Sequence, residues 1–329
     1  MKRRKFIQNV AIGGVGLVVG CSADSNPSGS TLPDVDPPDP AITKSKIALV
    51  KTSNRSEGVS RLMQMFEFES PENMDVILKP NFNTSDPPPA STHTDTLRQI
   101  ITELNNRNAS SIELCERTYQ NFDEVINEKQ VRLVTDEFGI RITNLDGSDC
   151  TRYASNAASW PNGFLFPSKI MDSNYIVTTC CLKTHFIGQI TISLKLGVGL
   201  LPASMMQTMH SSTNINSMIA EINTAYQPKL IIVDGVTTFI EGGPSQGTTA
   251  EGNVMLAGTD RLALDIIGSA ILKDLGSQSL SGPIMNIQQI RRARELNLGK
   301  SNLDEIEFIT DDEISSSYSN RLSEIIALG

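Results

Sequence analysis

The sequence has no Cys-x-x-Cys pair, only three histidines and only 5% aromatic residues. Ferredoxin-type iron–sulfur clusters and zinc ribbons take their cysteines from such pairs, so the sequence excludes both kinds of site. Because aromatic residues are scarce, the core must be mainly aliphatic. A hydrophobic content of 39% and a charged content of 20% indicate a folded domain rather than a disordered or membrane-spanning chain.

The chain begins with four cations, Lys2 to Lys5, followed by a short apolar run over residues 10–20. That run is too short to span a bilayer, which takes about 20 apolar residues. A charged start before a short apolar run is typical of a signal peptide, and the stretch from Arg3 resembles the twin-arginine export motif. The alternative is a chance basic start before a buried helix.

Residues 18–20 and Cys21 resemble a lipobox, which implies cleavage before Cys21 and its lipidation. More than one acyl chain gives stable anchoring. The resemblance therefore implies the twin-arginine export machinery as a partner and an exported protein. We expect Cys21 to anchor it to the membrane of the cell envelope, facing the periplasm. Such export usually carries folded proteins, often with a cofactor already inserted.

Three regions follow from composition: a signal peptide over 1–21, a Pro/Ser/Asp-rich linker over 22–45 and a folded domain over 46–329. The linker cannot bury a core, so we expect a tether. Without residues 1–20 the cations fall from 28 to 24 against 37 acids, a net charge near −13. Such a surface repels phosphate backbones, which argues against nucleic acid as a partner.

Strand-like and helical runs alternate along the domain. The predicted strands cover 46–50, 76–79, 111–115, 140–145, 175–182, 230–234, 254–257 and 305–309. The predicted helices cover 58–66, 94–107, 122–138, 214–226, 261–275 and 283–296. This alternation predicts an α/β fold with a mixed, largely parallel sheet covered by helices on both faces. In such sheets ligands bind at the carboxyl ends of strands, where polar motifs fall here.

Four cysteines lie in the predicted domain: Cys115, Cys150, Cys180 and Cys181. A disulfide between two of them is compatible with an oxidising compartment, whereas buried small hydrophobic side chains are the simpler interpretation. The adjacent Cys180 and Cys181 should point to opposite faces of a strand.

Two of the polar motifs come early in the domain. Lys79 and Asn81 follow the strand over 76–79 and offer a cation and an amide, which suit a carboxylate or phosphate; the alternative is an ordinary turn. Thr92 and His93 precede the helix predicted from residue 94, and a helix start attracts anions through its free N–H groups. The alternative there is a plain N-cap with an exposed histidine.

The most informative segment follows the strand over 175–182. Lys183 and His185 are two residues apart, so in an extended chain they face the same way. Lys195 sits in the apolar run over 190–201, where a lysine costs desolvation energy unless it has a partner or a function. A lysine that extends its amine to solvent is the alternative.

Carboxylates mark two later positions. Asp234 ends a predicted strand and precedes a glycine-rich loop with Glu241 and Gly243, where glycines allow close approach of a ligand. Asp260 directly precedes the helix predicted from residue 261, and Asp265 lies five residues later. Capping of that helix is the favoured role for Asp260.

Together, these segments resemble the domain of unknown function 362 family over roughly residues 46–275. The resemblance is carried in order by Lys79-Pro80-Asn81, Lys183-Thr184-His185, Ser193-Leu194-Lys195, Asp234-Gly235, Glu241-Gly242-Gly243-Pro244 and Asp260 to Asp265. The chain departs from the family at Leu196, where relatives often carry asparagine. It also lacks the cysteine-rich ferredoxin module of many relatives, so no iron–sulfur cluster is expected.

A more distant likeness is to the nickel-pincer lactate racemases. In them a histidine precedes a cofactor-bearing lysine by ten residues and another histidine follows; here His185 precedes Lys195 by ten and His210 follows by fifteen. The glycines that flank the racemase lysine are not matched. This likeness implies a metal or metal-organic cofactor, for which His93, His185 and His210 are the candidate ligands.

Two functions fit these observations. In the first, the protein is an enzyme: Lys79, Lys183 and Lys195 hold a small anionic substrate, His185 is the general acid or base, and Asp234 or Glu241 assists. The other substrate-binding candidates are Asn81, Thr92, His93, Gly243, Asp260 and Asp265. In the second, the same cleft captures an anionic ligand or metal complex without converting it. A purely structural lipoprotein would leave the clustered lysines unexplained.

Overall fold

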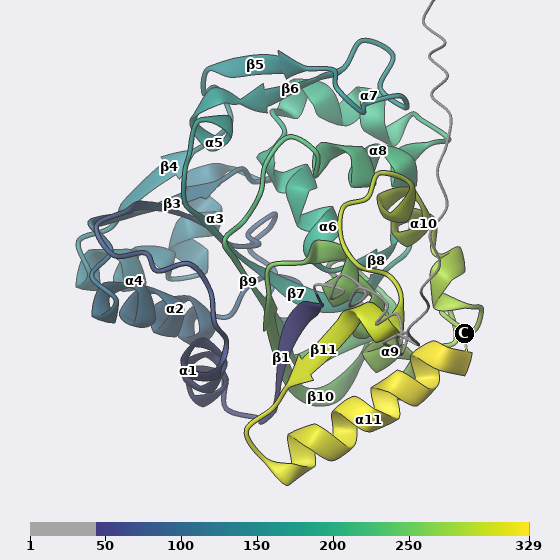
Figure 1. The fold of residues 1–329 in the computed structure, drawn as a ribbon. Coiled ribbons are helices and arrows are strands. Elements are labelled where there is room, and N and C mark those ends of the chain that lie inside the picture. Colours follow the sequence, from purple (N-terminus) through teal and green to yellow (C-terminus); the bar gives the residue numbers. More distant parts are fainter. Residues whose placement is uncertain (1–43, 329) are drawn as a thin grey trace, which may run out of the picture. The chain divides into compact units, whose positions relative to one another are not determined.

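The computed structural model describes residues 44–328, and Figure 1 shows their arrangement. The predicted signal peptide over 1–21, with its Cys21, lies outside the described residues, as do all but the last two positions of the predicted linker. Within 44–328, no helix is both long enough and apolar enough to cross a membrane.

A nine-stranded sheet runs through the described part of the chain in the order β11-β1-β10-β9-β7-β2-β3-β4, with β8 paired to β7. Its strands are β1 (Ser45–Lys51), β2 (Asp75–Lys79), β3 (Ser111–Glu116), β4 (Arg141–Asn144), β7 (Ile176–His185), β8 (Gln189–Thr191), β9 (Leu230–Gly242), β10 (Gly247–Gly258) and β11 (Ile306–Ile309). The run β9-β7-β2-β3-β4 is parallel throughout, whereas β10 is antiparallel to both of its neighbours. The structure confirms an α/β fold with a mixed, largely parallel sheet.

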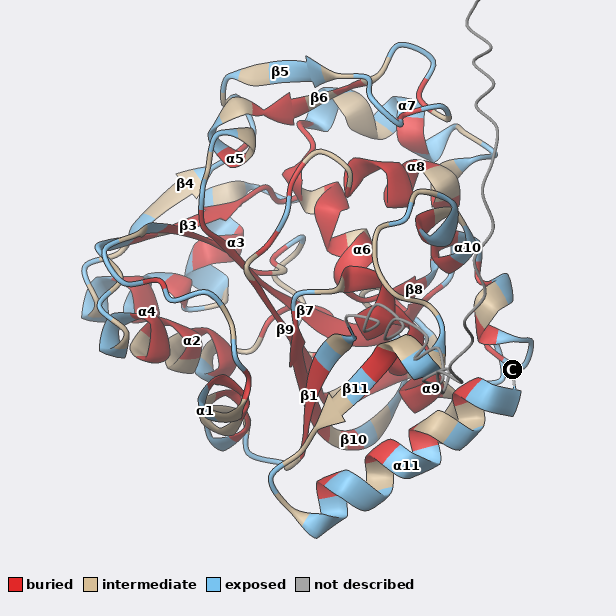
Figure 2. Ribbon diagram, viewed as in Figure 1, coloured by how far each residue is buried: buried red, intermediate tan, exposed pale blue. Residues whose placement is uncertain are grey.

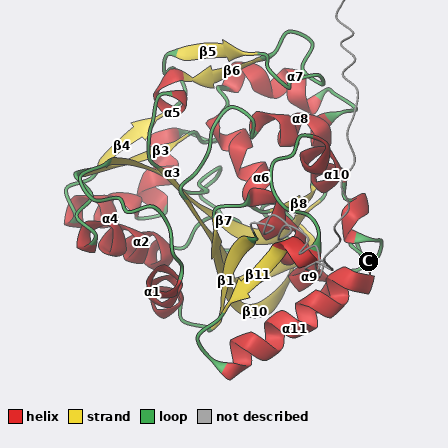
Figure 3. Cartoon of the chain, in the orientation of Figure 1, coloured by secondary structure: helices red, strands yellow, loops and turns green. Residues whose placement is uncertain are grey.

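Helices cover both faces of this sheet, as predicted (Figures 1 and 3). The α-helices are α1 (Arg55–Met65), α2 (Thr94–Asn106), α3 (Phe122–Glu128), α4 (Val131–Glu137), α5 (Ser168–Met171), α6 (Ser193–Leu196), α7 (Met206–His210), α8 (Ile215–Ile222), α9 (Arg261–Asp274), α10 (Gln288–Glu295) and α11 (Glu313–Leu328). Alternate side chains of β1 show the two faces: Ile47 packs into the core under α9, and Ala48 packs into the core under α1 and α2. The inner strands β7 and β9 are accordingly buried along most of their length (Figure 2).

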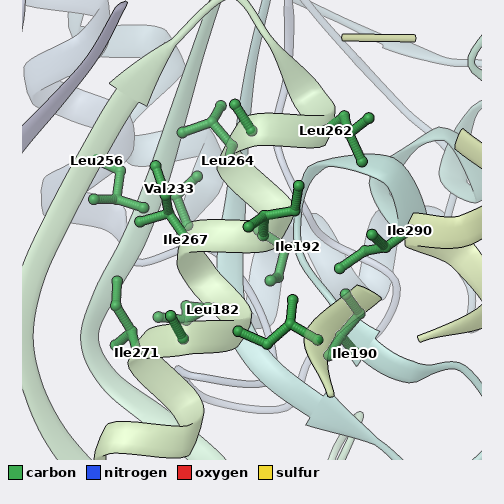
Figure 4. Close-up of a cluster of buried hydrophobic side chains, with 14 of the residues drawn as sticks. Leu182, Ile190, Ile192, Val233, Leu256, Leu262, Leu264, Ile267, Ile271 and Ile290 are labelled. Carbon is green, nitrogen blue, oxygen red and sulfur yellow. The ribbon is translucent and has the colours of Figure 1, made fainter. Parts of the chain in front are cut away.

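Helix α9 is the centre of one of these cores (Figure 4). It is buried from Arg261 to Leu272, and most of these residues are apolar. Its Ile267 belongs to the same cluster as Leu182 of β7 and Ile192, which directly precedes α6. Burial of Ile192 against α9 therefore fixes the start of the segment that carries Lys195.

Several elements differ from the predicted ones. The helix predicted over 122–138 is two helices, because Gln130 adopts a left-handed conformation (φ 55°) between α3 and α4. Strand β7 continues to His185, and β9 and β10 form a long hairpin through the glycine-rich segment. The hairpin β5 (Cys150–Tyr153) with β6 (Phe164–Pro167) and the terminal helix α11 had no matching prediction.

The order of the parallel strands creates a crevice. From β2 the chain adds β3 and then β4 on one side, and it later returns to place β7 on the other side of β2. Loops leaving β2 and β7 therefore diverge at the carboxyl edge, which is where open α/β sheets bind ligands.

The cysteines do not link these elements. Cys115, Cys150, Cys180 and Cys181 are all free thiols, and Cys180 and Cys181 are neighbours in β7, as predicted. Burial raises the pKa of Cys180 and Cys181, so both thiols behave as small buried hydrophobic groups.

Candidate functional site

A cavity of about 680 Å³ lies at the carboxyl edge of the sheet. Its wall includes the last residue of each of three neighbouring parallel strands: Lys79 of β2, Glu116 of β3 and His185 of β7. The turn between β9 and β10 and the segment from α6 onward complete it. The cleft predicted from the strand-end motifs therefore gathers Lys79, Lys183, His185 and Lys195 in one place.

The charge of Lys79 is balanced inside the wall. Its Nζ lies 2.7 Å from Oε1 of Glu116, and both side chains are 1% exposed. The same Nζ donates to the Pro80 carbonyl at 2.6 Å, and the Glu116 carboxylate accepts a hydrogen bond from the Phe82 N–H at 2.7 Å. Burial lowers the pKa of Lys79, and Glu116 opposes that shift. Lys79 is thus a structural cation of the pocket, tied to a carboxylate of the chain.

Two further buried cations of the pocket have no carboxylate partner among the described residues. The Lys183 ammonium donates to the carbonyl oxygens of Ala90 and, at 2.9 Å, Pro244. The Arg117 guanidinium makes only long contacts with a carbonyl and a sulfur, and its buried Nε has no hydrogen-bond partner within residues 44–328. Burial lowers the pKa of Lys183 and of Arg117, although Asp86 opposes the shift of Lys183 and Glu116 and Asp146 oppose that of Arg117. Neither side chain forms an ion pair with these carboxylates.

Lys195 is a third cation of the pocket, and it is half-buried. Across the part of the chain that the structure describes, its Nζ makes neither an ion pair nor a hydrogen bond. Burial, followed by repulsion from Lys183 and Arg117, lowers the pKa of Lys195 to about 8. The pocket therefore holds three unbalanced cations on its wall, which together attract an anion.

The position of Lys195 is fixed by contacts around α6. The Asn223 amide donates to the Leu194 carbonyl at 2.9 Å, and the Asp265 carboxylate accepts from the Ser193 N–H at 2.8 Å. Gly188 leaves room for the lysine, since a Cβ there would lie 3.1 Å from Cε of Lys195. Asp265, predicted as a substrate-binding residue, acts on the site through the helix that presents Lys195.

His185 is neutral in this environment. Its Nδ1 accepts hydrogen bonds from the N–H groups of Ile187 (3.0 Å) and Gly188 (3.1 Å), which places the ring proton on Nε2. Burial, followed by repulsion from Lys195 and Lys183, lowers the pKa of His185 to about 2. The geometry therefore makes Nε2–H a hydrogen-bond donor rather than a base.

These contacts do not fit a resident nickel ion held by His185. A ligating imidazole offers a lone pair to the metal, whereas the Nε2 lone pair of His185 is occupied by the ring proton. His210 also lines the pocket, with its Nδ1 2.9 Å from the Met206 carbonyl, but His93 does not. No group of three His, Cys, Asp or Glu side chains within residues 44–328 is placed to hold a metal, and we derive no step through one.

Asp234, predicted as catalytic, does not line the pocket. It points to the face of the sheet covered by α1 and α2, where its Oδ2 lies 2.8 Å from Nε of Arg55 and accepts from the Thr96 hydroxyl at 2.8 Å. In β9 the side chain of Asp234 shares a face with Ile232, which belongs to the core under those helices. Its contacts tie β9 to α1 and α2.

Four other predicted residues have local structural contacts. The Thr92 hydroxyl accepts from the Asn81 N–H at 2.9 Å, and the His93 ring caps α2 by accepting from the Asp95 N–H at 3.1 Å. Glu241 accepts from the Ser279 N–H at 2.9 Å in the loop after α9. Asp260 caps α9 through Ala263 at 2.9 Å, as favoured from the sequence.

Asn81 and Gly243 do line the pocket. The Nδ2 of Asn81 is buried and has no partner within the described residues. Gly243 has φ of +70°, and a Cβ there would collide with the Thr184 carbonyl. The glycine-rich loop therefore packs directly against the end of β7.

The sequence reasoning missed Glu116 and Arg117. Both follow Cys115 at the end of the predicted strand over 111–115. Because an acid and a base follow the predicted strand next to the Lys79 strand, their position could have identified them as site residues.

Comparison with known proteins places the chain in a family. No curated protein matches it. Among solved structures it resembles the apoprotein of the lactate racemase from Thermoanaerobacterium thermosaccharolyticum, with a TM-score of 0.43 and 10% sequence identity, over 66% of this chain. The chain spans 54% of the length of that protein. Residues 76–270 match a protein family over more than half of the chain and include the strand ends that line the pocket. The chain belongs to this family, the domain of unknown function DUF362.

Proposed function

We propose that the pocket binds a small organic anion, namely a carboxylate, and that the protein is an enzyme acting on it. One observation carries the proposal: Arg117, Lys183 and Lys195 line the same cavity without a carboxylate partner in the described chain. Unpaired cations that have lost their water are costly to hold in place. A bound carboxylate offsets that cost. Among the residues that line the pocket, Glu116 is the acidic one, and its charge is paired with Lys79.

The proposed chemistry is proton transfer at the carbon next to the carboxylate. With a pKa of about 8, Lys195 can release and regain a proton near neutral pH, as a general base must. Lys183 and Arg117 hold the carboxylate and stabilise the added negative charge when the proton leaves. His185, a neutral donor, supports a substrate oxygen through Nε2–H, a role known for imidazoles of lowered pKa.

The test is hydrogen exchange in D₂O with a panel of 2-substituted carboxylates, followed by proton NMR. The native protein is expected to incorporate deuterium next to the carboxylate of its substrate, and Lys195→Met should abolish this incorporation while the circular dichroism spectrum is kept. Lys46→Met is the matched control, because Lys46 is exposed on β1 and pairs with Glu67 at 3.2 Å.

Binding by calorimetry separates the remaining outcomes. Tight carboxylate binding with no exchange or product would favour the capture of an anion without conversion. If no carboxylate binds at all, the proposal is wrong.

We propose further that the protein is exported and held in the envelope by lipidated Cys21. The support is the sequence alone: Arg3 and Arg4 before a short apolar run that ends at Cys21. The full chain made in a bacterial host should partition into the detergent phase of an envelope extract. Cys21→Ser should move it to the aqueous phase, and Arg3→Lys with Arg4→Lys should leave it in the cytoplasm. A native chain that remains in the aqueous phase contradicts this location.

A further inference from the structure

Exposed apolar side chains gather at the mouth of the pocket. Six large hydrophobic residues of the described chain are exposed: Tyr119, Leu133, Phe186, Ile187, Ile314 and Leu328. Three of them, Tyr119, Phe186 and Ile187, line this one cavity. Isolated exposed apolar residues are ordinary, but a group around one cavity indicates a binding surface.

This apolar rim is held in place by the chain. The Tyr119 N–H donates to the Asn83 carbonyl at 2.7 Å, and the Phe186 N–H donates to the Gly243 carbonyl at 3.4 Å. The Phe186 ring stacks on the His185 ring with centroids 5.3 Å apart and an interplanar angle of 13°. Although Phe186 is 74% exposed, its ring is thus presented in a defined orientation beside a pocket group.

The size and polarity of the cavity agree with a ligand larger than a simple acid. A cavity of 680 Å³ falls within the range of roughly 300–1,000 Å³ that holds drug-sized molecules. Leu196, Val198 and Met206 add apolar side chains to the lining of the cavity. A short carboxylate bound at the three cations would leave both this wall and the rim in contact with water.

We propose that the substrate is an amphiphilic organic acid that carries an aryl group. Its carboxylate lies against Arg117 and Lys183, the carbon next to it faces Lys195, and its ring lies at the mouth against Phe186 and Tyr119. An aromatic ring suits the mouth because two of its three exposed apolar residues are aromatic, and ring pairs gain energy beyond the burial of area. This inference rests on the proposed function and names the substrate class of the same site.

The test compares three probes by calorimetry with the full chain: propionate, 3-phenylpropionate and the uncharged 3-phenylpropionamide. Burial of a phenyl ring against the rim should make 3-phenylpropionate bind about tenfold or more tightly than propionate. Phe186→Ala should reduce that ratio several-fold. Leu133→Ala is the matched control, because Leu133 is 64% exposed on α4 and does not line the pocket, so the native ratio should persist.

The outcomes separate the two proposals. If both acids bind equally, or if Phe186→Ala leaves the ratio unchanged, the aryl inference is overturned and the proposed carboxylate site stands. If the amide binds as tightly as the acid, or if neither acid binds, the anion site itself is wrong and the inference falls with it.

Discussion

Asp265 and Ser193 are joined by two hydrogen bonds: Oδ1 of the aspartate accepts from both the backbone N–H and the hydroxyl of the serine at 2.8 Å. Ser193 is the first residue of α6, and Lys195 lies two residues later. Asp265 is fully buried in α9, and burial raises its pKa to about 7 although the bonds from Ser193 oppose the shift. A carboxylate in the core thus holds the short helix that presents Lys195 to the pocket.

Asp265→Asn is expected to weaken this arrangement. The amide would bring an N–H donor against the N–H groups of α6, and a buried unpaired donor costs about 1–3 kcal/mol. We predict a lower free energy of unfolding by that amount and several-fold weaker carboxylate binding, measured by urea denaturation and calorimetry. Asp260→Ala is the control: it removes the cap of α9, which costs roughly 1 kcal/mol, but should leave carboxylate affinity unchanged.

Stability should depend on pH through Lys195. Its pKa is about 8 in the folded protein and 10.5 when unperturbed. Between these values the unfolded chain binds more protons, so the free energy of unfolding rises with pH in that window. Below pH 8, burial of the charged Lys195 amine lowers the free energy of unfolding by its full amount, up to roughly 3 kcal/mol. Without ligand, Lys195→Met should therefore be more stable than the native protein at pH 7, and by less at pH 10. An equal difference at both pH values in urea denaturation would argue against an uncompensated charge.

His185 should stay neutral throughout the physiological range. Its pKa of about 2 and the two bonds to Nδ1 predict a single tautomer with the proton on Nε2. Nitrogen-15 NMR of the imidazole rings between pH 5 and 8 should show no titration for this residue. A midpoint near the ordinary value of 6.5 would mean that the ring is hydrated and free to act as a base.

Asp234 should matter for stability and not for the ligand. Asp234→Ala leaves Arg55 and the Thr96 hydroxyl without their partner, and breaking a buried ion pair costs about 3–5 kcal/mol. Carboxylate affinity should be unchanged in whatever fraction remains folded, for example at low temperature. If the variant instead lost carboxylate affinity and kept its normal stability, Asp234 would have to belong to the ligand site.

The sheet and much of the pocket could be predicted, because both follow from local patterns. Apolar runs placed the eight main strands, and the positions of Lys79, Lys183 and His185 at strand ends were enough to bring them to one edge. Lys195 could be predicted as a site residue because a charged side chain within an apolar run costs desolvation energy unless it has a function. That Lys195 pairs with no carboxylate of residues 44–328, however, depends on which acids lie nearby in space.

Asp234 shows what the sequence could not supply. It ends a predicted strand just as Lys79 does, yet its side chain points to the other face, toward α1 and α2. In the structure β9 continues to Gly242, so Asp234 lies within the strand and not at its end. The pairing of Lys79 with Glu116 and the apolar rim at Phe186 likewise depend on contacts between distant loops.

The pKa of the Lys195 amine, with and without bound carboxylate, tests the central claim most directly. Competitive labelling of the lysines across pH, read by mass spectrometry, reports it in the intact protein. We predict a pKa of about 8 in the free protein that rises when 3-phenylpropionate saturates the pocket, because a bound anion opposes the repulsion from Lys183 and Arg117. A pKa near 10.5 that the carboxylate does not change would contradict a pocket of unbalanced cations.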